Sequence, residues 1–454
     1  MSRLFWFRRD LRLQDNVALN QAVAGAVSDG DNQVHPVYAL DSSVFESLEG
    51  IRQWSLHESL KSLQRSLGGN LSVVVGSPAA SLVDAATKAD VSVVHATRAF
   101  DTRGVAEQNA VGLALKDAGI FLQLDDSYYA VAPGSVKKPD GSPYRVYTPF
   151  FKNWFQHGWA KPVALAEGAI WRSIDGQTEI PLPTKDSPIR VTASEAFAVK
   201  TFERFKHRAL ENYGDDRNRA DLSGTSHLSH ALAFGEIHPR TILADLQDSP
   251  GEEVFRKEIA WREFYADVLW HNPHTDHDYY EPRFKEMRYD VGPDADAKLL
   301  AWQQGKTGFP MVDAGMRQLL ATGWMHNRVR MIVASFLIKD LHLEWQLGAD
   351  WFERNLSDFD PASNAHGWQW TAGCGTDASP YYRVFNPVLQ GYKFDPRGDY
   401  IRKYVPELAH IWGPEIHEPW LRLDGLSQGY PSRIVDHATE RDESLARLKE
   451  IKKD

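Results

Sequence analysis

The segment from Trp324 to Trp370 holds the densest collection of polar side chains that could do chemistry together. Its middle part, residues 331–343 (MIVASFLIKDLHL), is largely apolar and predicts a buried helix. Charged and amide side chains flank this run: Asn327, Arg328 and Arg330 precede it, and Asp358, Asp360 and Asn364 follow it. Because charges beside a core helix are costly unless they pair with each other or with a bound group, the pattern predicts a deep pocket for a polar ligand.

Two further motifs could bind parts of such a ligand. In residues 224–229 (GTSHLS), Thr225 or Ser226 is placed to cap the helix that follows, and a helix N-terminus of this kind suits a phosphate. Glu258 and Trp261 share one face of a predicted helix, and a carboxylate beside an indole suits recognition of a nucleobase. Taken alone, each motif is better explained by an ordinary N-cap, or by a core tryptophan and a salt-bridged glutamate.

A third group could contact nucleic acid. Asn327, Arg328 and Met331 fall on one helical face, where they could contact a base edge, a phosphate and a damaged ring. Trp368 and Trp370 are separated by one residue, so one can point inward and the other to a cleft, with plain packing as the alternative. No zinc-ligand spacing and no GxSxG or HExxH motif is present, so the sequence does not support a hydrolase.

Composition limits the class of protein. A chain of 454 residues predicts two domains, and its 15 tryptophans suggest an aromatic core or a site that stacks planar molecules. The single cysteine, Cys374, fits a reducing cytoplasm, and no signal peptide or membrane-spanning run is expected. The net charge of −10 argues weakly against general nucleic-acid binding, which depends on a local basic face.

The elements that must position these residues fall into three parts. Residues 1–130 alternate β-rich runs with helical stretches near 14–26, 52–68, 78–88 and 104–118, which predicts a doubly wound parallel α/β domain. No GxGxxG turn follows the first strand, so an ordinary dinucleotide crevice is not supported. Residues 131–200 predict a long interdomain connector, and residues 201–454 predict a larger all-α domain.

The motifs together resemble the photolyase and cryptochrome flavoprotein family over essentially the whole chain, with class I cyclobutane pyrimidine dimer photolyases as the most similar members. The resemblance rests on FWFRRDLRLQDN, TSHLS, AWREFY, KTGFPMVDAGMRQL, GWMHNRVRM, WQWTAGCGTDASPYYRVFNP and QGYKF, in this order. It implies an N-terminal α/β domain that holds a light-harvesting antenna and a C-terminal helical domain that buries FAD.

The resemblance also implies which residues bind FAD. Those expected at the phosphates and ribitol are Tyr213, Thr225, Ser226, Leu228 and Ser229. Asp358, paired with Arg330, and Asp360 would meet the polar edge of the flavin, and Asn364 would face its reactive nitrogen. By the same resemblance, the position of Asn364 is an Asp in plant cryptochromes and a Cys in insect cryptochromes. An Asn is typical of a repair enzyme that keeps FAD fully reduced.

Substrate choice follows from the same resemblance. The resemblance implies that enzymes which repair the 6-4 photoproduct have histidines at the positions of Asn327 and Met331. Because this chain has Asn and Met there, it is expected to split cyclobutane pyrimidine dimers in UV-damaged DNA. The dimer would be turned out of the duplex into a pocket above the flavin, because photolyases extrude their target bases from the duplex. Its expected contacts are Glu258, Asn327, Trp261, Trp370 and Met331, with Arg328 and Gln390 on the backbone. A cryptochrome photoreceptor and a 6-4 photolyase are the alternatives; the end of the chain soon after ARLKEIKKD, without a long tail, also disfavours the photoreceptor.

Two family features differ in this chain. Trp368 and Trp345 resemble the inner and middle members of the tryptophan chain that re-reduces FAD, but the outer position falls in MRYDVGPDADAK, where Tyr289 is the nearest aromatic residue. A neutral tyrosine must lose a proton when it is oxidised. Residues 97–103 lack the Asn-Glu pair of folate-binding relatives, so the antenna, a deazaflavin or methenyltetrahydrofolate, is undecided. The protein is expected to be a cytoplasmic monomer with no obligate protein partner.

Overall fold

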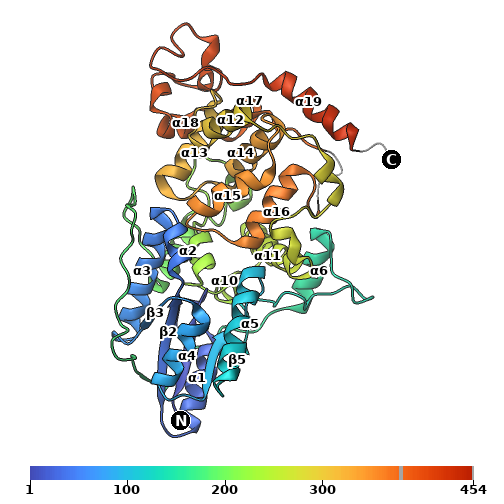
Figure 1. Cartoon of the computed structure of the whole chain (residues 1–454). Helices are drawn as coiled ribbons and strands as arrows, with labels where there is room; N and C mark the ends of the chain where they lie inside the picture. Colours follow the sequence, from blue (N-terminus) through green and yellow to red (C-terminus); the bar gives the residue numbers. More distant parts are fainter. Residues whose placement is uncertain (378–381, 452–454) are drawn as a thin grey trace. The chain divides into compact units, whose positions relative to one another are not determined.

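Short apolar strands separated by helices form a parallel sheet in the first part of the chain (Figure 1). The computed structural model describes residues 1–377 and 382–451, so part of the WQWTAGCGTDASPYYRVFNP motif and the last residues of ARLKEIKKD lie outside the described residues. The chain divides into two compact units: Met1–Leu210 with Ser226–Pro273, and Glu211–Thr225 with His274–Asp454. The functional division at residues 130 and 200 stays a prediction.

The sheet of the first unit has the order β3-β2-β1-β4-β5, with β6 paired to β2. Every pairing is parallel, which confirms the predicted doubly wound α/β fold. The strands are β1 (Arg3–Phe7), β2 (Gln33–Leu40), β3 (Ser72–Val75), β4 (Val93–Thr97), β5 (Phe121–Asp125) and β6 (Ile170–Trp171).

Side chains of β1 alternate between two cores, one on each face of the sheet. Phe5 and Phe7 pack with α1 and α3, whereas Leu4 and Trp6 pack with α4 and α5. Both faces are therefore buried, as the continuously apolar RLFWF run requires. The helices that connect these strands are α1 (Val17–Ser28), α2 (Ser42–Ser47), α3 (Gly50–Ser66), α4 (Pro78–Lys88) and α5 (Thr102–Asp117).

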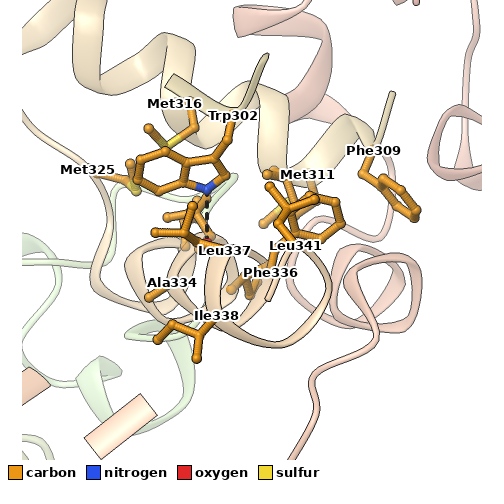
Figure 2. Close-up of a cluster of buried hydrophobic side chains, with 14 of the residues drawn as sticks. Trp302, Phe309, Met311, Met316, Met325, Ala334, Phe336, Leu337, Ile338 and Leu341 are labelled. Carbon is orange, nitrogen blue, oxygen red and sulfur yellow. Dashed lines mark hydrogen bonds between the residues drawn. The ribbon is translucent and has the colours of Figure 1, made fainter. Parts of the chain in front are cut away.

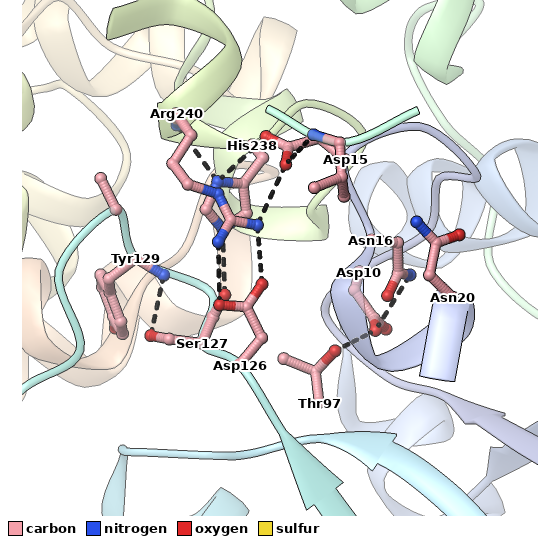
Figure 3. Close-up of polar contacts among 12 residues, drawn as sticks. Asp10, Asp15, Asn16, Asn20, Thr97, Asp126, Ser127, Tyr129, His238 and Arg240 are labelled. Atoms are coloured by element: carbon pink, nitrogen blue, oxygen red, sulfur yellow. Dashed lines mark hydrogen bonds and ion pairs between the residues drawn. The ribbon is translucent and has the colours of Figure 1, made fainter. Parts of the chain in front are cut away.

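The segment 226–273 belongs to the first unit because buried polar contacts join it to the sheet (Figure 3). The guanidinium of Arg240 donates two hydrogen bonds to Asp126, at 2.9 and 2.7 Å, and lies 3.0 Å from Asp15. His238 Nε2 lies 2.9 Å from the carbonyl oxygen of Ser127. The predicted boundaries at residues 130 and 200 rest on strand and helix patterns, which do not reveal such contacts between distant side chains. The helices concerned are α9 (Ser229–Phe234), α10 (Pro239–Asp245) and α11 (Pro250–His271).

The predicted connector, residues 131–200, contains regular structure that the sequence analysis did not predict. Helix α6 (Tyr147–His157) buries Phe150 and Trp154, and α7 (Glu195–Arg208) begins before residue 200. The side chain of Ser194 caps α7 by accepting from the N–H of Phe197 at 2.9 Å. Aromatic residues spaced along one face of α6 explain why this piece is helical despite its proline-rich surroundings.

The second unit is helical in the part of it that the structure describes, as predicted. Its core is built from α13, α14, α15 and α16, with Trp302 fully buried among methionine and leucine side chains (Figure 2). Trp302 Nε1 donates to the carbonyl oxygen of Val333 at 3.0 Å. The helices are α8 (Tyr213–Asp216), α12 (Pro293–Gln303), α13 (Pro310–Thr322), α14 (Asn327–Lys339), α15 (Trp345–Asn355), α16 (Pro361–Ala372), α17 (Pro387–Phe394), α18 (Asp399–Tyr404) and α19 (His437–Glu450).

Helix α14 is the predicted buried helix, but it lies four residues earlier in the chain than the apolar run. It begins at Asn327 because the side chain of His326 accepts a hydrogen bond from the N–H of Arg328. It ends at Lys339, shortly before His342, which has a φ of 55°. Asn327, Arg328 and Arg330 are therefore the first turn of the helix rather than residues preceding it.

His417 in this unit gives the protein an acid-sensitive element. The side chain is 1% exposed, and burial lowers its pKa to about 4. Between about pH 6.5 and pH 4 the unfolded chain binds a proton there that the folded protein does not, so acidification costs up to about 3 kcal/mol of unfolding free energy. Urea denaturation at both pH values should show that His417→Gln loses less stability on acidification than the unaltered protein. Equal losses would contradict this assignment.

Candidate functional site

An ion pair joins two of the predicted cofactor residues. Arg330, in the first turn of α14, donates to Asp358 Oδ2 at 2.7 Å and to the carbonyl oxygen of Met325 at 2.8 Å. The side chain of Asp358 is 1% exposed, and its Oδ1 has no hydrogen-bond partner among the described residues. A buried carboxylate oxygen without a donor is costly, so Oδ1 fits the N–H groups at the polar edge of a flavin.

The start of α16 places the other two polar residues. Asp360 is the N-cap of this helix, and its side chain accepts from the N–H of Ser363 at 2.9 Å. One turn on, Asn364 Nδ2 donates to the carbonyl oxygen of Ala349 at 3.1 Å. The amide of Asn364 is thereby held in one orientation by the backbone of α15, a contact between distant residues that the sequence could not indicate.

Asn327, Arg328 and Met331 lie together on α14, as their spacing predicted. Asn327 is exposed, whereas Arg328 and Met331 are half-buried. The guanidinium of Arg328 donates two hydrogen bonds to Asn218 Oδ1, at 3.1 and 2.7 Å, and lies 4.7 Å from the centre of the Phe394 ring. Asn218 could not be predicted from the sequence, because no motif surrounds it.

The predicted phosphate-binding residues are divided between the two units. Tyr213 and Thr225 belong to the second unit, and Ser226, Leu228 and Ser229 to the first. The predicted cap is wrong, because α9 begins at Ser229 and its N-cap is Leu228, without a capping side chain. Ser226 Oγ instead accepts from the N–H of Leu228 at 3.3 Å, which is a local turn. Their role in binding FAD stays a prediction.

Glu258 and Trp261 are carried by α11 of the first unit. Both are half-buried, one turn apart on the helix. The indole of Trp261 stacks on Tyr147, with ring centres 3.7 Å apart and planes inclined by 8°. The hydroxyl of Tyr147 donates to the carbonyl oxygen of Lys257 at 2.7 Å, so one face of Trp261 is covered by a ring that is itself fixed.

The second unit holds the remaining predicted substrate residues. Trp368 is 3% exposed and Trp370 is half-buried, so the two point to different surroundings, as predicted. Trp370 Nε1 donates to the carbonyl oxygen of Asp377 at 3.2 Å. Gln390 lies on α17 and is half-buried.

The predicted electron donors lie in the same unit. The ring of Trp368 packs against Phe352 and Trp302, with centres 5.0 and 6.1 Å apart. It also covers Gly348 of α15, where an added Cβ would overlap its ring. Gly348 is one turn from Trp345, which is 1% exposed. Nε1 of Trp368 and of Trp345 have no hydrogen-bond partner in the described part of the chain, so both indoles sit in apolar surroundings.

Membrane-spanning helices and metal-binding clusters are both absent from the described residues. No helix among them is long and apolar enough to cross a membrane. Nor do they contain a cluster of three or more His, Cys, Asp or Glu side chains that could hold a metal ion.

Comparisons with known proteins identify related sequences over both parts of the chain. Residues 255–450 match the FAD binding domain of DNA photolyase, and residues 3–167 match DNA photolyase. With the buried carboxylate described above, these matches define an FAD-binding flavoprotein. The chain belongs to the DNA photolyase family.

Individual relatives resemble the chain along its length. A deoxyribodipyrimidine photo-lyase of Agrobacterium fabrum is 39% identical over 478 residues, covering 99% of this chain and 98% of that protein. A bacterial class III photolyase from Agrobacterium tumefaciens has a TM-score of 0.87 at 37% identity, covering 100% of this chain and 98% of that one. An archaeal photolyase from Sulfolobus tokodaii with two FAD molecules has a TM-score of 0.84 at 27% identity, covering 99% and 100%. The subclass of this chain, for which its motifs predicted class I, stays a prediction.

Proposed function

We propose that this protein is a deoxyribodipyrimidine photo-lyase, which splits cyclobutane pyrimidine dimers in UV-damaged DNA with light. The observation that carries the proposal is the face of α14 on which Asn327 and Met331 lie beside Arg330 and its partner Asp358. Neither an amide nor a thioether donates a proton as an acid, which suits a ring opening without net proton transfer. The names of the full-length relatives support the same activity.

FAD, when bound, supplies the light-absorbing one-electron donor. The residues of this chain would hold and orient it. Asp358, oriented by Arg330, would accept hydrogen bonds at the polar edge of the ring, and Asp360, the N-cap of α16, would lie near that edge. Because Nδ2 of Asn364 is directed at Ala349, its amide oxygen is the atom proposed to face the reactive nitrogen. An oxygen acceptor there suits the protonated nitrogen of a reduced flavin.

The substrate contacts are proposed residue by residue. Glu258 and Asn327 would hydrogen-bond the dimer, Trp261 and Trp370 would flank it, and Met331 would pack beneath it. Arg328 and Gln390 would contact the DNA backbone. Weakened stacking and pairing at the lesion lower the cost of turning the dimer out of the duplex, which supplies selectivity.

Trp261→Ala is expected to weaken binding to dimer-containing DNA by about 1–3 kcal/mol, the usual contribution of one aromatic side chain that stacks on a base. Since Tyr147 covers one face of the indole, the other face is the one available to the dimer. Fluorescence anisotropy with a dimer-containing oligonucleotide measures the loss, and FAD content should not change. Trp270→Ala is the matched control, because Trp270 lies on the same helix and is 40% exposed. Unchanged affinity of Trp261→Ala would remove Trp261 from the pocket.

We further propose that the α/β domain holds an antenna chromophore, either a deazaflavin or methenyltetrahydrofolate. A relative with two FAD molecules supports a second chromophore without identifying it for this chain. We also propose that the protein is a cytoplasmic monomer that needs no protein partner.

The test of the function is repair of a synthetic thymine dimer in single-stranded DNA by chemically reduced enzyme, with blue light on and off. Light-dependent recovery of thymine is the expected result. If reduced FAD is bound and no thymine is recovered, the proposal is wrong. Repair of the 6-4 photoproduct instead would overturn the assignment of Asn327 and Met331, and repair of neither lesion would favour a photoreceptor.

A further inference from the structure

Tyr279 connects two residues that were predicted to donate electrons. Its side chain is 3% exposed, and its ring meets Trp345 edge to face, with centres 6.1 Å apart and planes at 89°. Tyr289 packs against the same apolar cluster and lies close enough for the two tyrosines to influence each other's pKa. Tyr279 therefore contacts the ring of Trp345 and is a neighbour of Tyr289.

The hydroxyl group of Tyr279 is hydrogen-bonded to a carboxylate. It donates to Glu344 Oε1 at 3.2 Å. Glu344 is exposed and directly precedes Trp345 at the start of α15. Burial raises the pKa of both tyrosines, so both are protonated phenols at neutral pH. A proton that leaves Tyr279 has an acceptor at hand, and that acceptor is open to water.

The other end of the cluster reaches the surface. Tyr289 is half-buried and lines a surface pocket together with Arg288, Asp290 and Lys298. A small reductant in solution can therefore approach Tyr289, whereas Trp345 and Tyr279 are closed to it.

We propose that Tyr279 is the electron relay that follows Trp345, that Glu344 is the base that takes its proton, and that Tyr289 is the exit to solvent. This inference rests on the proposed function. It replaces a single outer donor by two neighbouring tyrosines and a carboxylate.

Electron transfer begins at Trp368, which gives one electron to the light-excited oxidised flavin, the oxidant, and recovers one from Trp345. Tyr279 then gives an electron to the Trp345 radical cation and its hydroxyl proton to Glu344. Tyr279 thereby becomes a neutral tyrosyl radical, and Glu344 becomes a neutral carboxylic acid. Tyr289 passes a hydrogen atom, its electron and proton, to the Tyr279 oxygen. A thiol in solution restores Tyr289 with a hydrogen atom and becomes a thiyl radical, and Glu344 releases its proton to water.

The experiment compares radicals after a laser flash on the oxidised, FAD-loaded protein, by transient absorption and EPR. Unaltered protein should form a neutral tyrosyl radical, more slowly in D2O than in H2O because a proton moves with the electron. Tyr279→Phe keeps the ring contact with Trp345 but removes the hydroxyl, so the tyrosyl radical should vanish and steady photoreduction with thiol should fall several-fold. Glu344→Gln keeps a hydrogen-bond acceptor but no base, so tyrosyl formation should slow.

Two variants separate the members of the cluster. Tyr289→Phe should still form a tyrosyl radical, on Tyr279, but thiol should quench it more slowly. Tyr400→Phe is the matched control, because Tyr400 is equally buried and donates to the amide oxygen of Gln318 at 2.7 Å. It should behave like unaltered protein.

A tyrosyl radical of normal yield in Tyr279→Phe, or normal formation in Glu344→Gln, would overturn the proposal. All variants should repair dimers normally once reduced chemically. Failure of the unaltered, reduced protein to repair would overturn the proposed function instead, and would leave the radical measurements to decide the relay.

Discussion

Trp368→Phe is expected to slow light-driven reduction of oxidised FAD by at least roughly tenfold, equivalent to about 1.4 kcal/mol in the barrier. The phenylalanine keeps an apolar ring against Phe352 and Gly348, but it is much harder to oxidise than an indole. Because Trp368 Nε1 has no hydrogen-bond partner among the described residues, the substitution leaves no polar group unpaired. Absorbance during blue illumination with thiol measures the rate, and chemically reduced variant should still repair dimers.

Trp302→Phe is the matched control for this experiment. Trp302 is as deeply buried as Trp368 and contacts it, and its loss also breaks the hydrogen bond to Val333. Any general loosening of the core should therefore be at least as large in the control, while the route through Trp368 and Trp345 is kept. Rapid photoreduction in Trp368→Phe would show that electrons enter by another route.

Arg330→Met is expected to lower the unfolding free energy by about 3–5 kcal/mol, because it leaves the buried carboxylate of Asp358 without its partner. The methionine preserves the apolar stem but not the two hydrogen bonds of the guanidinium. FAD should also be lost, since the carboxylate that meets the flavin edge is no longer held in place. Denaturation in urea and the ratio of flavin to protein absorbance after purification measure the two effects.

An exposed arginine supplies the control for Arg330→Met. Arg397 pairs with Asp399 at 3.1 Å, but its side chain is 74% exposed. Arg397→Met should therefore change the unfolding free energy by less than about 1 kcal/mol and leave the FAD content unchanged. If Arg330→Met behaves like this control, the Arg330–Asp358 pair neither stabilises the site nor orients the cofactor.

The sheet and the shared helical face of Asn327 and Met331 could be predicted because their signals are local. The RLFWF run and its successors alternate with helical stretches, and the types of Asn327 and Met331 are visible without coordinates. The first turn of α14 was misplaced because its cap is His326, a residue rarely used for this purpose. The predicted cap at Thr225 or Ser226 is wrong because the hydroxyl of Ser226 closes a local turn instead.

Contacts between distant residues account for what the sequence could not provide. Tyr279 and Trp345 are far apart in the chain, and nothing near either residue indicates that their rings meet. The same holds for Arg328 and Asn218, and for Asn364 and the carbonyl oxygen of Ala349. Such contacts depend on how helices pack, which periodicity alone does not determine.

Glycine at position 348 meets two requirements, close packing of the core and a short path for electrons from Trp368. Any side chain there would have to push the Trp368 ring or Leu337 aside, and so would separate α15 from α16. That displacement would loosen the core and lengthen the path between Trp368 and the aromatic residues that follow it. A population of natural variants should therefore keep glycine at this position even in lineages that no longer depend on light for repair, because stability alone would still remove the alternatives.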